Sequence, residues 1–93
     1  GDILTELVLW HDLYCDMKIG DKKLRIKMET FSDFLIDNIM MLIELFRCDD
    51  RGAIHDPNDS VAIMTDRILN MRTKILTDRF DTMMKNGDFN VQK

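Results

Sequence analysis

Residues 57–86 read PNDSVAIMTDRILNMRTKILTDRFDTMMKN, and this stretch decides the predicted fold. Its apolar side chains recur three or four positions apart, which at about 100° per residue gathers them on one side of an α-helix. One flank of that side carries Val61, Met64, Ile68, Met71 and Ile75, and the other carries Leu69, Leu76, Phe80 and Met83. Asp56 and Pro57 are typical of a helix N-terminus, and Gly87 is typical of a helix end. We therefore expect a long helix over residues 57–86.

A row of polar side chains interrupts this apolar side at seven-residue intervals: Asn58, Thr65, Arg72, Arg79 and Asn86. A structural interpretation is that each guanidinium reaches water past the edge of the core, or pairs with a buried carboxylate such as that of Glu6. A functional interpretation is a positive groove between helices that binds a small anionic ligand such as a nucleotide, because arginine holds phosphate and carboxylate groups bidentately. The residues of that ligand site would be Arg72, Arg79, Thr65 and Glu6. A third interpretation is a contact with the acidic stripe of another subunit.

Residues 2–19 are predicted to form the first helix. Its apolar side carries Ile3, Leu7, Trp10, Tyr14 and Met17, which step along the chain at helical spacing. Trp10 and Tyr14 are expected to act as aromatic anchors in the core or at an interface. His11 and Cys15 have the spacing of two metal ligands on a helix, but no third or fourth ligand is evident, so we predict no metal site.

Residues 21–48 are predicted to form the second helix. Leu24, Met28, Phe31, Leu35, Leu42 and Phe46 lie on one of its sides. The strict alternation over residues 23–28 leaves a β-hairpin over residues 15–28 as an alternative. Further apolar residues extend the apolar side over more than half of the circumference, which requires more than one neighbouring helix. Because only two other helices are available, we expect a homo-oligomer, with a dimer favoured.

These elements predict an all-α, three-helix up-down bundle completed by self-association. Residues 1–87 would form a single helical domain and residues 88–93 a flexible tail. The chain has 93 residues, which suits one small domain.

Charge and composition narrow the classes of partner. The net charge of −4 and the pI of about 5.0 disfavour nucleic acid as a partner. No apolar run approaches the roughly 20 residues of a membrane span, so no membrane is expected. Cys15 and Cys48 are interpreted as free, buried thiols in a reducing compartment, which indicates a cytoplasmic protein.

The sequence contains few arrangements of residues that are typical of catalytic sites. There is no nucleophile–base–acid set, no glycine-rich phosphate loop and no cofactor motif, so an enzyme is not favoured. Glu29, Asp33 and Asp37 are similar to the acidic stripes that hold magnesium in all-α nucleotide pyrophosphohydrolases. The paired Glu-x-x-Glu and Glu-x-x-Asp motifs of those enzymes are absent. A metal-dependent nucleotide hydrolase is therefore the third hypothesis, after the binder of an anionic ligand.

The leading hypothesis is a small non-catalytic interaction module, an adaptor or inhibitor that works as a homo-oligomer. It would contact another protein through an exposed helix face or through the polar loop of residues 49–56. The residues expected at such contacts are Trp10, Tyr14, Met40, Arg51 and His55.

Overall fold

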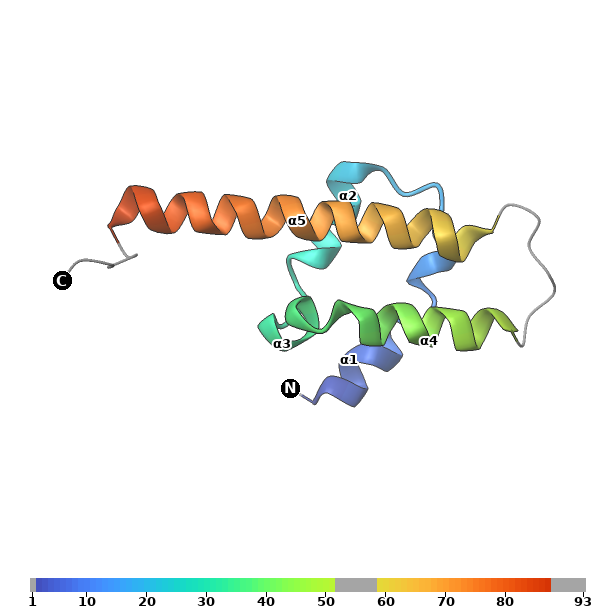
Figure 1. Cartoon of the computed structure of the whole chain (residues 1–93). Helices are drawn as coiled ribbons and strands as arrows, with labels where there is room; N and C mark the ends of the chain where they lie inside the picture. The colour runs from blue at the N-terminus through green and yellow to red at the C-terminus, as the bar shows by residue number, and fades with distance from the viewer. Residues whose placement is uncertain (1, 52–58, 88–93) are drawn as a thin grey trace.

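The computed structural model describes residues 2–51 and 59–87. These ranges form α1 (Ile3–Trp10), the short 3-10 helix η1 (Leu13–Cys15), α2 (Asp21–Met28), α3 (Asp33–Asp37), α4 (Ile39–Arg51) and α5 (Ser60–Asn86), with no strand among them (Figure 1). The all-α prediction is confirmed. The count of three helices is wrong, because the first predicted helix ends early at Trp10 and the second is broken twice. Within the described ranges, no helix is long and apolar enough to cross a membrane.

Short polar side chains cause the two breaks in the predicted second helix. Thr30 Oγ1 donates to a carbonyl of the preceding turn at 2.6 Å, and Ser32 Oγ caps α3 by accepting from the N–H of Leu35 at 3.1 Å. Asn38 ends α3, and its Nδ2 donates to the carbonyl four positions earlier at 2.9 Å. Such local bonds compete with the helical backbone pattern. The alternative hairpin over residues 15–28 is also wrong, since Asp21–Met28 is helical.

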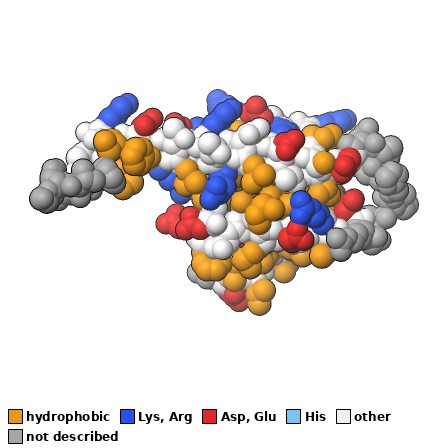
Figure 2. Space-filling model, viewed as in Figure 1, with side chains coloured by type: hydrophobic (Ala, Val, Ile, Leu, Met, Phe, Trp, Pro, Cys, Tyr) orange, Lys and Arg blue, Asp and Glu red, His pale blue; other side chains and the backbone are white. Residues whose placement is uncertain are grey.

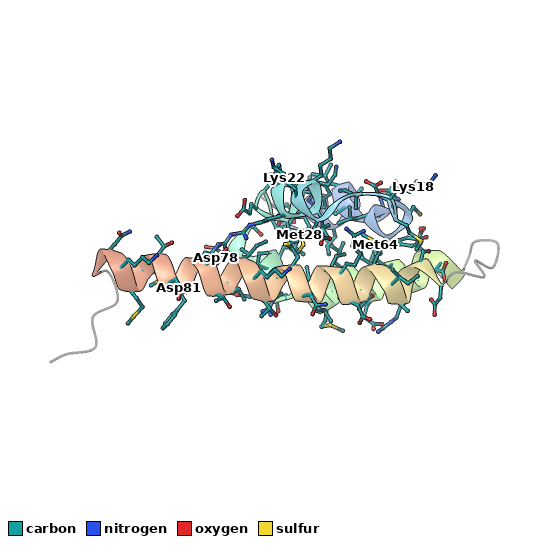
Figure 3. All side chains as sticks on the ribbon, turned by 90° about the horizontal axis from the view of Figure 1, so that it is seen from above. Lys18, Lys22, Met28, Met64, Asp78 and Asp81 are labelled. Carbon is teal, nitrogen blue, oxygen red and sulfur yellow. The ribbon has the colours of Figure 1, made fainter. Side chains whose placement is uncertain are left out.

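The long helix α5 is the element against which most of the others pack. Figure 1 shows α4 running antiparallel beside it, while α2 and η1 cover another side in Figure 3. Helix α1 lies against α3 and α4. The fully buried side chains at the centre come from α2, α3, α4 and α5: Leu24, Met28, Leu35, Ile36, Leu42, Ile43, Phe46, Met64, Ile68 and Ile75.

The breaks give the apolar residues of the predicted second helix partners within one chain. Helix α2 packs on α5, α4 packs on both α5 and α1, and α3 packs on α1 and α4, so most of that apolar surface is buried. The exposed exceptions are Ile26, Phe34, Met40 and Met41, at 57%, 56%, 48% and 42% exposure. An excess of apolar surface on one unbroken helix is therefore not a reason for self-association here. Cys15 and Cys48 are free, as expected, but exposed rather than buried.

The two predicted flanks of α5 have different environments. Val61, Met64, Ile68, Met71 and Ile75 are all buried, as predicted. On the second flank Leu69 and Leu76 are half-buried, while Phe80 and Met83 are 50% and 42% exposed. The helix begins after Asp59, whose carboxylate accepts from the N–H of Ala62 at 3.3 Å. Asp56, Pro57, Asn58 and the tail of residues 88–93 lie outside the described residues.

Candidate functional site

Arg72 sits at the break between α3 and α4. Its Nε donates to the carbonyl oxygen of Ile36 at 2.6 Å, in the last turn of α3. Carbonyls at a helix end lack partners within the helix and carry partial negative charge, which a guanidinium neutralises. Arg72 therefore acts as a side-chain cap that joins α5 to the α3–α4 corner.

Arg79, seven positions after Arg72 on α5, makes a looser contact. Its Nη1 lies 3.4 Å from Asp33 Oδ1, and the Asp33 side chain is 92% exposed. An ion pair this exposed contributes little to stability. Two cationic residues of the predicted groove thus contact α3, at its end and at its first turn.

Glu6 has a different partner from the one expected. Its carboxylate accepts from the backbone N–H of Ser32 at 2.6 Å and from Ser32 Oγ at 2.7 Å. Ser32 is the N-cap of α3, so Glu6 anchors α1 to the start of α3. The expected pairing of Glu6 with an arginine of α5 is wrong.

Thr65 lies in a separate place from the arginines. Its Oγ1 is buried and, within the described residues, has no hydrogen-bond partner. It lines a hollow of about 490 Å³ together with Val61, Ala62, Arg47, Asp50, Asp59 and Asp66. Arg72 lines a different hollow, which includes Asp37 and Leu69. The four residues of the predicted anion site are therefore not gathered around one cavity.

Arg67 is the arginine whose importance the sequence did not reveal. Its guanidinium donates to the carbonyl oxygens of Met17 at 3.3 Å and Ile19 at 2.6 Å, and it pairs with Asp21 at 2.8 Å. It thereby holds the irregular stretch between η1 and α2 on α5. By helical periodicity Arg67 falls away from the two apolar flanks of residues 57–86. Its backbone acceptors lie in residues 2–19, which were predicted as helix, where carbonyl groups would be paired within the helix.

The two aromatic residues of the predicted interaction set serve the core. Tyr14 is 4% exposed and packs on Phe46, with ring centroids 5.3 Å apart. Its hydroxyl donates to Asp49 Oδ2 at 2.5 Å, and this bond, together with burial, raises the pKa of Tyr14 above its ordinary value. Trp10 is half-buried, its ring 5.2 Å from that of Phe31.

The other predicted interaction residues are Met40, Arg51 and His55. Met40 is exposed on α4. Arg51 is the last residue of α4, but its side chain lies outside the described part, as does all of His55.

The acidic stripe of the hydrolase hypothesis does not lie on one helix. Glu29 follows α2 and pairs with Arg25 at 3.1 Å, whereas Asp33 and Asp37 belong to α3. Among residues 2–51 and 59–87, no group of three or more His, Cys, Asp and Glu side chains could hold a metal ion.

An apolar surface on α1 and α4 is the most prominent feature that the core does not use. A hollow of about 510 Å³ is lined by Leu7, Met40, Met41, Glu44, Leu45 and Cys48. Beside Leu7, helix α1 exposes Leu4 at 66% and Val8 at 67%. We call this set the α1/α4 surface; Figure 2 shows hydrophobic side chains gathered along the edge of the molecule where α1 lies.

The charges around the α1/α4 surface are mostly negative. Residues 2–17 contain Asp2, Glu6, Asp12 and Asp16 and no lysine or arginine. On α4, Glu44 lines the hollow and forms an ion pair with Arg47. The arrangement can hold an apolar side chain or helix face and favours basic residues at its edge.

Comparison of the chain with protein-family models, curated proteins and solved structures gives no match.

Proposed function

We propose that this chain is a small non-catalytic interaction module, an adaptor or inhibitor that acts as a homo-oligomer and binds another protein. The observation that carries the proposal is the α1/α4 surface. Leu4 and Val8 are each about two thirds exposed, on the same helix as Leu7, which lines a hollow formed almost entirely by apolar side chains. Exposed apolar surface of this kind marks binding sites in small soluble domains.

The shape and composition of the α1/α4 surface favour an amphipathic helix as the partner element. A shallow apolar groove between two helices accepts the apolar side of a third helix. Met40 and Met41 border the groove, and methionine adapts to partners of different shape. Covering a side chain such as Val8 contributes about 1–2 kcal/mol, so a few such contacts give useful affinity.

Charge selects among helices that could occupy the groove. Residues 2–17 contribute four acidic side chains and no lysine or arginine, and the cation nearest α1 is Lys27, over the ring of Trp10, so a partner with lysine or arginine beside its apolar residues is attracted. A second copy of the same surface would bring acidic groups against acidic groups and is disfavoured.

Site-specific photocrosslinking in the cells that produce the protein tests this proposal. We expect a crosslinker at Val8 to yield one discrete heavier adduct, and the added substitution Met40→Glu to abolish it. A crosslinker at Lys23, which is exposed on α2, is the matched control and should give no such adduct. Equal adducts from both positions, or none from Val8, would overturn the proposal.

A further inference from the structure

The positive charge of the chain is concentrated on and beside α2. Residues 18–27 read KIGDKKLRIK and contain five of the 13 lysine and arginine residues, in a chain whose net charge is −4. The single acidic residue in this stretch, Asp21, is held at 2.8 Å by Arg67 of α5 and so does not neutralise the lysines. A positive region therefore lies on an otherwise acidic protein.

The lysines of this region are not used by the fold. Lys18, Lys22 and Lys23 are exposed and, within the described part of the chain, form no ion pair. Figure 3 shows Lys18 and Lys22 on the side that points away from α5. Lys22 and Lys23 lie in the first turn of α2, where a cation opposes the helix dipole. Their charge therefore does not stabilise the helix that carries it.

An exposed isoleucine lies among these lysines. Ile26 is 57% exposed. It follows Lys22 by four positions and Lys23 by three, and residues at these spacings are neighbours on the surface of a helix. Leu24 and Met28, on the other side of α2, are fully buried. Helix α2 thus presents an apolar side chain flanked by positive charges, and we call Lys22, Lys23 and Ile26 the α2 face.

The other charged groups of α2 already have partners. Arg25 is bound to Glu29 at 3.1 Å and to Asp78 at 2.6 Å. Lys27 Nζ lies over the ring of Trp10, 5.6 Å from its centre. The carboxylates at the two ends of α2 are both paired with arginines, so neither neutralises the α2 face.

The α2 face suits a short partner. Helix α2 has 8 residues and spans about 12 Å, and the attraction between exposed charges is screened beyond about 8 Å at physiological salt. Residues 2–17 carry four acidic side chains and no lysine or arginine, and they would repel an extended polyanion such as a nucleic acid or an anionic membrane. A short acidic segment can pair with the lysines without meeting those groups.

We infer that the α2 face binds a short acidic segment of a partner protein, in which aspartate or glutamate residues flank an apolar side chain that packs on Ile26. Opposite charge attracts the segment to the lysines, and the apolar contact selects among acidic sequences. The inference goes beyond the proposed function, because it names a second surface with the opposite charge preference from the α1/α4 surface. An adaptor with these two surfaces holds a basic and an acidic element at once.

Fluorescence anisotropy of the labelled peptide EEDLEELDEE, titrated with the whole chain, tests the inference. Exposed charge pairs are individually weak, so we expect a Kd on the order of 100 µM at about 20 mM salt and a higher Kd at about 200 mM salt. Lys22→Glu should raise the Kd about fivefold or more. It places a carboxylate in the first turn of α2, which favours the helix, so the fold should be retained.

A matched charge variant separates a local effect from an effect of net charge. Lys85→Glu changes the net charge equally, at an exposed position in the last turn of α5, and should leave the Kd within about twofold. Circular dichroism checks that both variants are folded. Lys23→Glu replaces Lys22→Glu if the latter is not.

The apolar contact is tested by Ile26→Ser. We expect this substitution to raise the Kd of the peptide about threefold or more. Val8→Ser, at an exposed apolar position of the α1/α4 surface, is the control and should leave the Kd within about twofold. In ¹⁵N NMR spectra the peptide should shift amide signals of residues 18–27 and leave those of α4 unchanged.

The inference is overturned if the peptide does not bind, if Lys85→Glu weakens binding as much as Lys22→Glu, or if the shifted amide signals lie on α4. Oligothymidylate or phosphatidylserine vesicles that bind more tightly than the peptide, and lose binding in Lys22→Glu, would also overturn it, since the lysines would then serve a polyanion.

The photocrosslink at Val8 reports on the α1/α4 surface separately. A partner captured by the crosslinker at Lys23 would differ in mass from the Val8 adduct and would persist in Met40→Glu. The failure of one proposal is therefore distinguishable from the failure of the other.

Discussion

The hydroxyl of Tyr14 and the carboxylate of Asp49 are joined by a hydrogen bond of 2.5 Å across 35 positions of the chain. The bond links η1 to the last turns of α4 and satisfies a polar group that is otherwise enclosed by the core. Because Asp49 is exposed, it recovers hydration when the tyrosine hydroxyl is removed. We expect Tyr14→Phe to lower the free energy of unfolding by about 1 kcal/mol, measured by urea denaturation. A loss above about 3 kcal/mol would show that the hydroxyl does more than bond to Asp49.

The same bond predicts how stability depends on pH. Tyr14 is the single tyrosine of the chain, and its pKa in the folded protein is raised by the bond to Asp49 and by burial. The folded state therefore keeps this proton above pH 10, where an unfolded tyrosine loses it. The stabilisation is complete below about pH 10 and falls as the pH rises further.

Absorbance of tyrosinate at alkaline pH follows this ionisation directly. We expect the midpoint for the folded wild type to lie above that of the unfolded chain in denaturant. The fall in stability above pH 10 should be shallower in Tyr14→Phe, which serves as the control for other groups. Coincident midpoints in the folded and unfolded protein would contradict the raised pKa.

Removing the Arg67 side chain should destabilise the connection between η1 and α2. Arg67→Ala leaves the carbonyls of Met17 and Ile19 without their donor, and we expect a loss of about 2–3 kcal/mol. Amide hydrogen exchange of residues 16–20 should accelerate. Lys74→Ala, on an exposed position of the same helix, is the control and should change stability by less than about 0.5 kcal/mol. Equal effects of the two substitutions would contradict the role of Arg67.

A double-mutant cycle distinguishes the observed partner of Glu6 from the expected one. Glu6→Ala and Ser32→Ala should show a coupling of about 1 kcal/mol, because their side chains are hydrogen-bonded. Glu6→Ala and Arg72→Ala should be additive within about 0.5 kcal/mol, measured by thermal or urea unfolding. Strong coupling between Glu6 and Arg72 would contradict this prediction and would support the ion pair that the sequence suggested.

Arg72→Ala also separates a structural role from a ligand-binding role. Loss of the bond to the Ile36 carbonyl should cost about 1–3 kcal/mol. If Arg72 instead served an anion, the variant would lose affinity for inorganic phosphate or ATP while its stability stayed unchanged. Calorimetric titration of wild type and variant provides the comparison.

The sequence predicted α5 well because its signals are long and consistent. The buried flank from Val61 to Ile75 repeats over four turns, and Gly87 adopts φ +72° at the end of the helix, as a stop signal should. The breaks at residues 29–32 and at Asn38 were not predicted, since a break of one to four residues barely disturbs a periodic pattern. Single polar residues such as Ser32 and Asn38 nonetheless reoriented the chain, through hydrogen bonds that no periodicity reports.

The candidate site was harder to predict than the fold. The sequence singled out Arg72 and Arg79 for their place among apolar residues, but their partners depend on where α3 begins and ends. Arg67 stayed hidden because its acceptors are backbone carbonyls of an irregular segment. Met40 was foreseen as exposed, whereas Leu4 and Val8 became prominent only once α1 was seen to end at Trp10 and to lie on α4.

The place of α5 in the chain has a consequence for synthesis. Helices α2 and α4 and the η1 turn all pack on α5, which is the last of the described helices to leave the ribosome. Until it emerges, α2 and α4 lack the surface of α5 on which they pack. We therefore expect apolar side chains of the nascent chain to be accessible to chaperones and proteases until α5 has been synthesised, and the core to be completed in one late step.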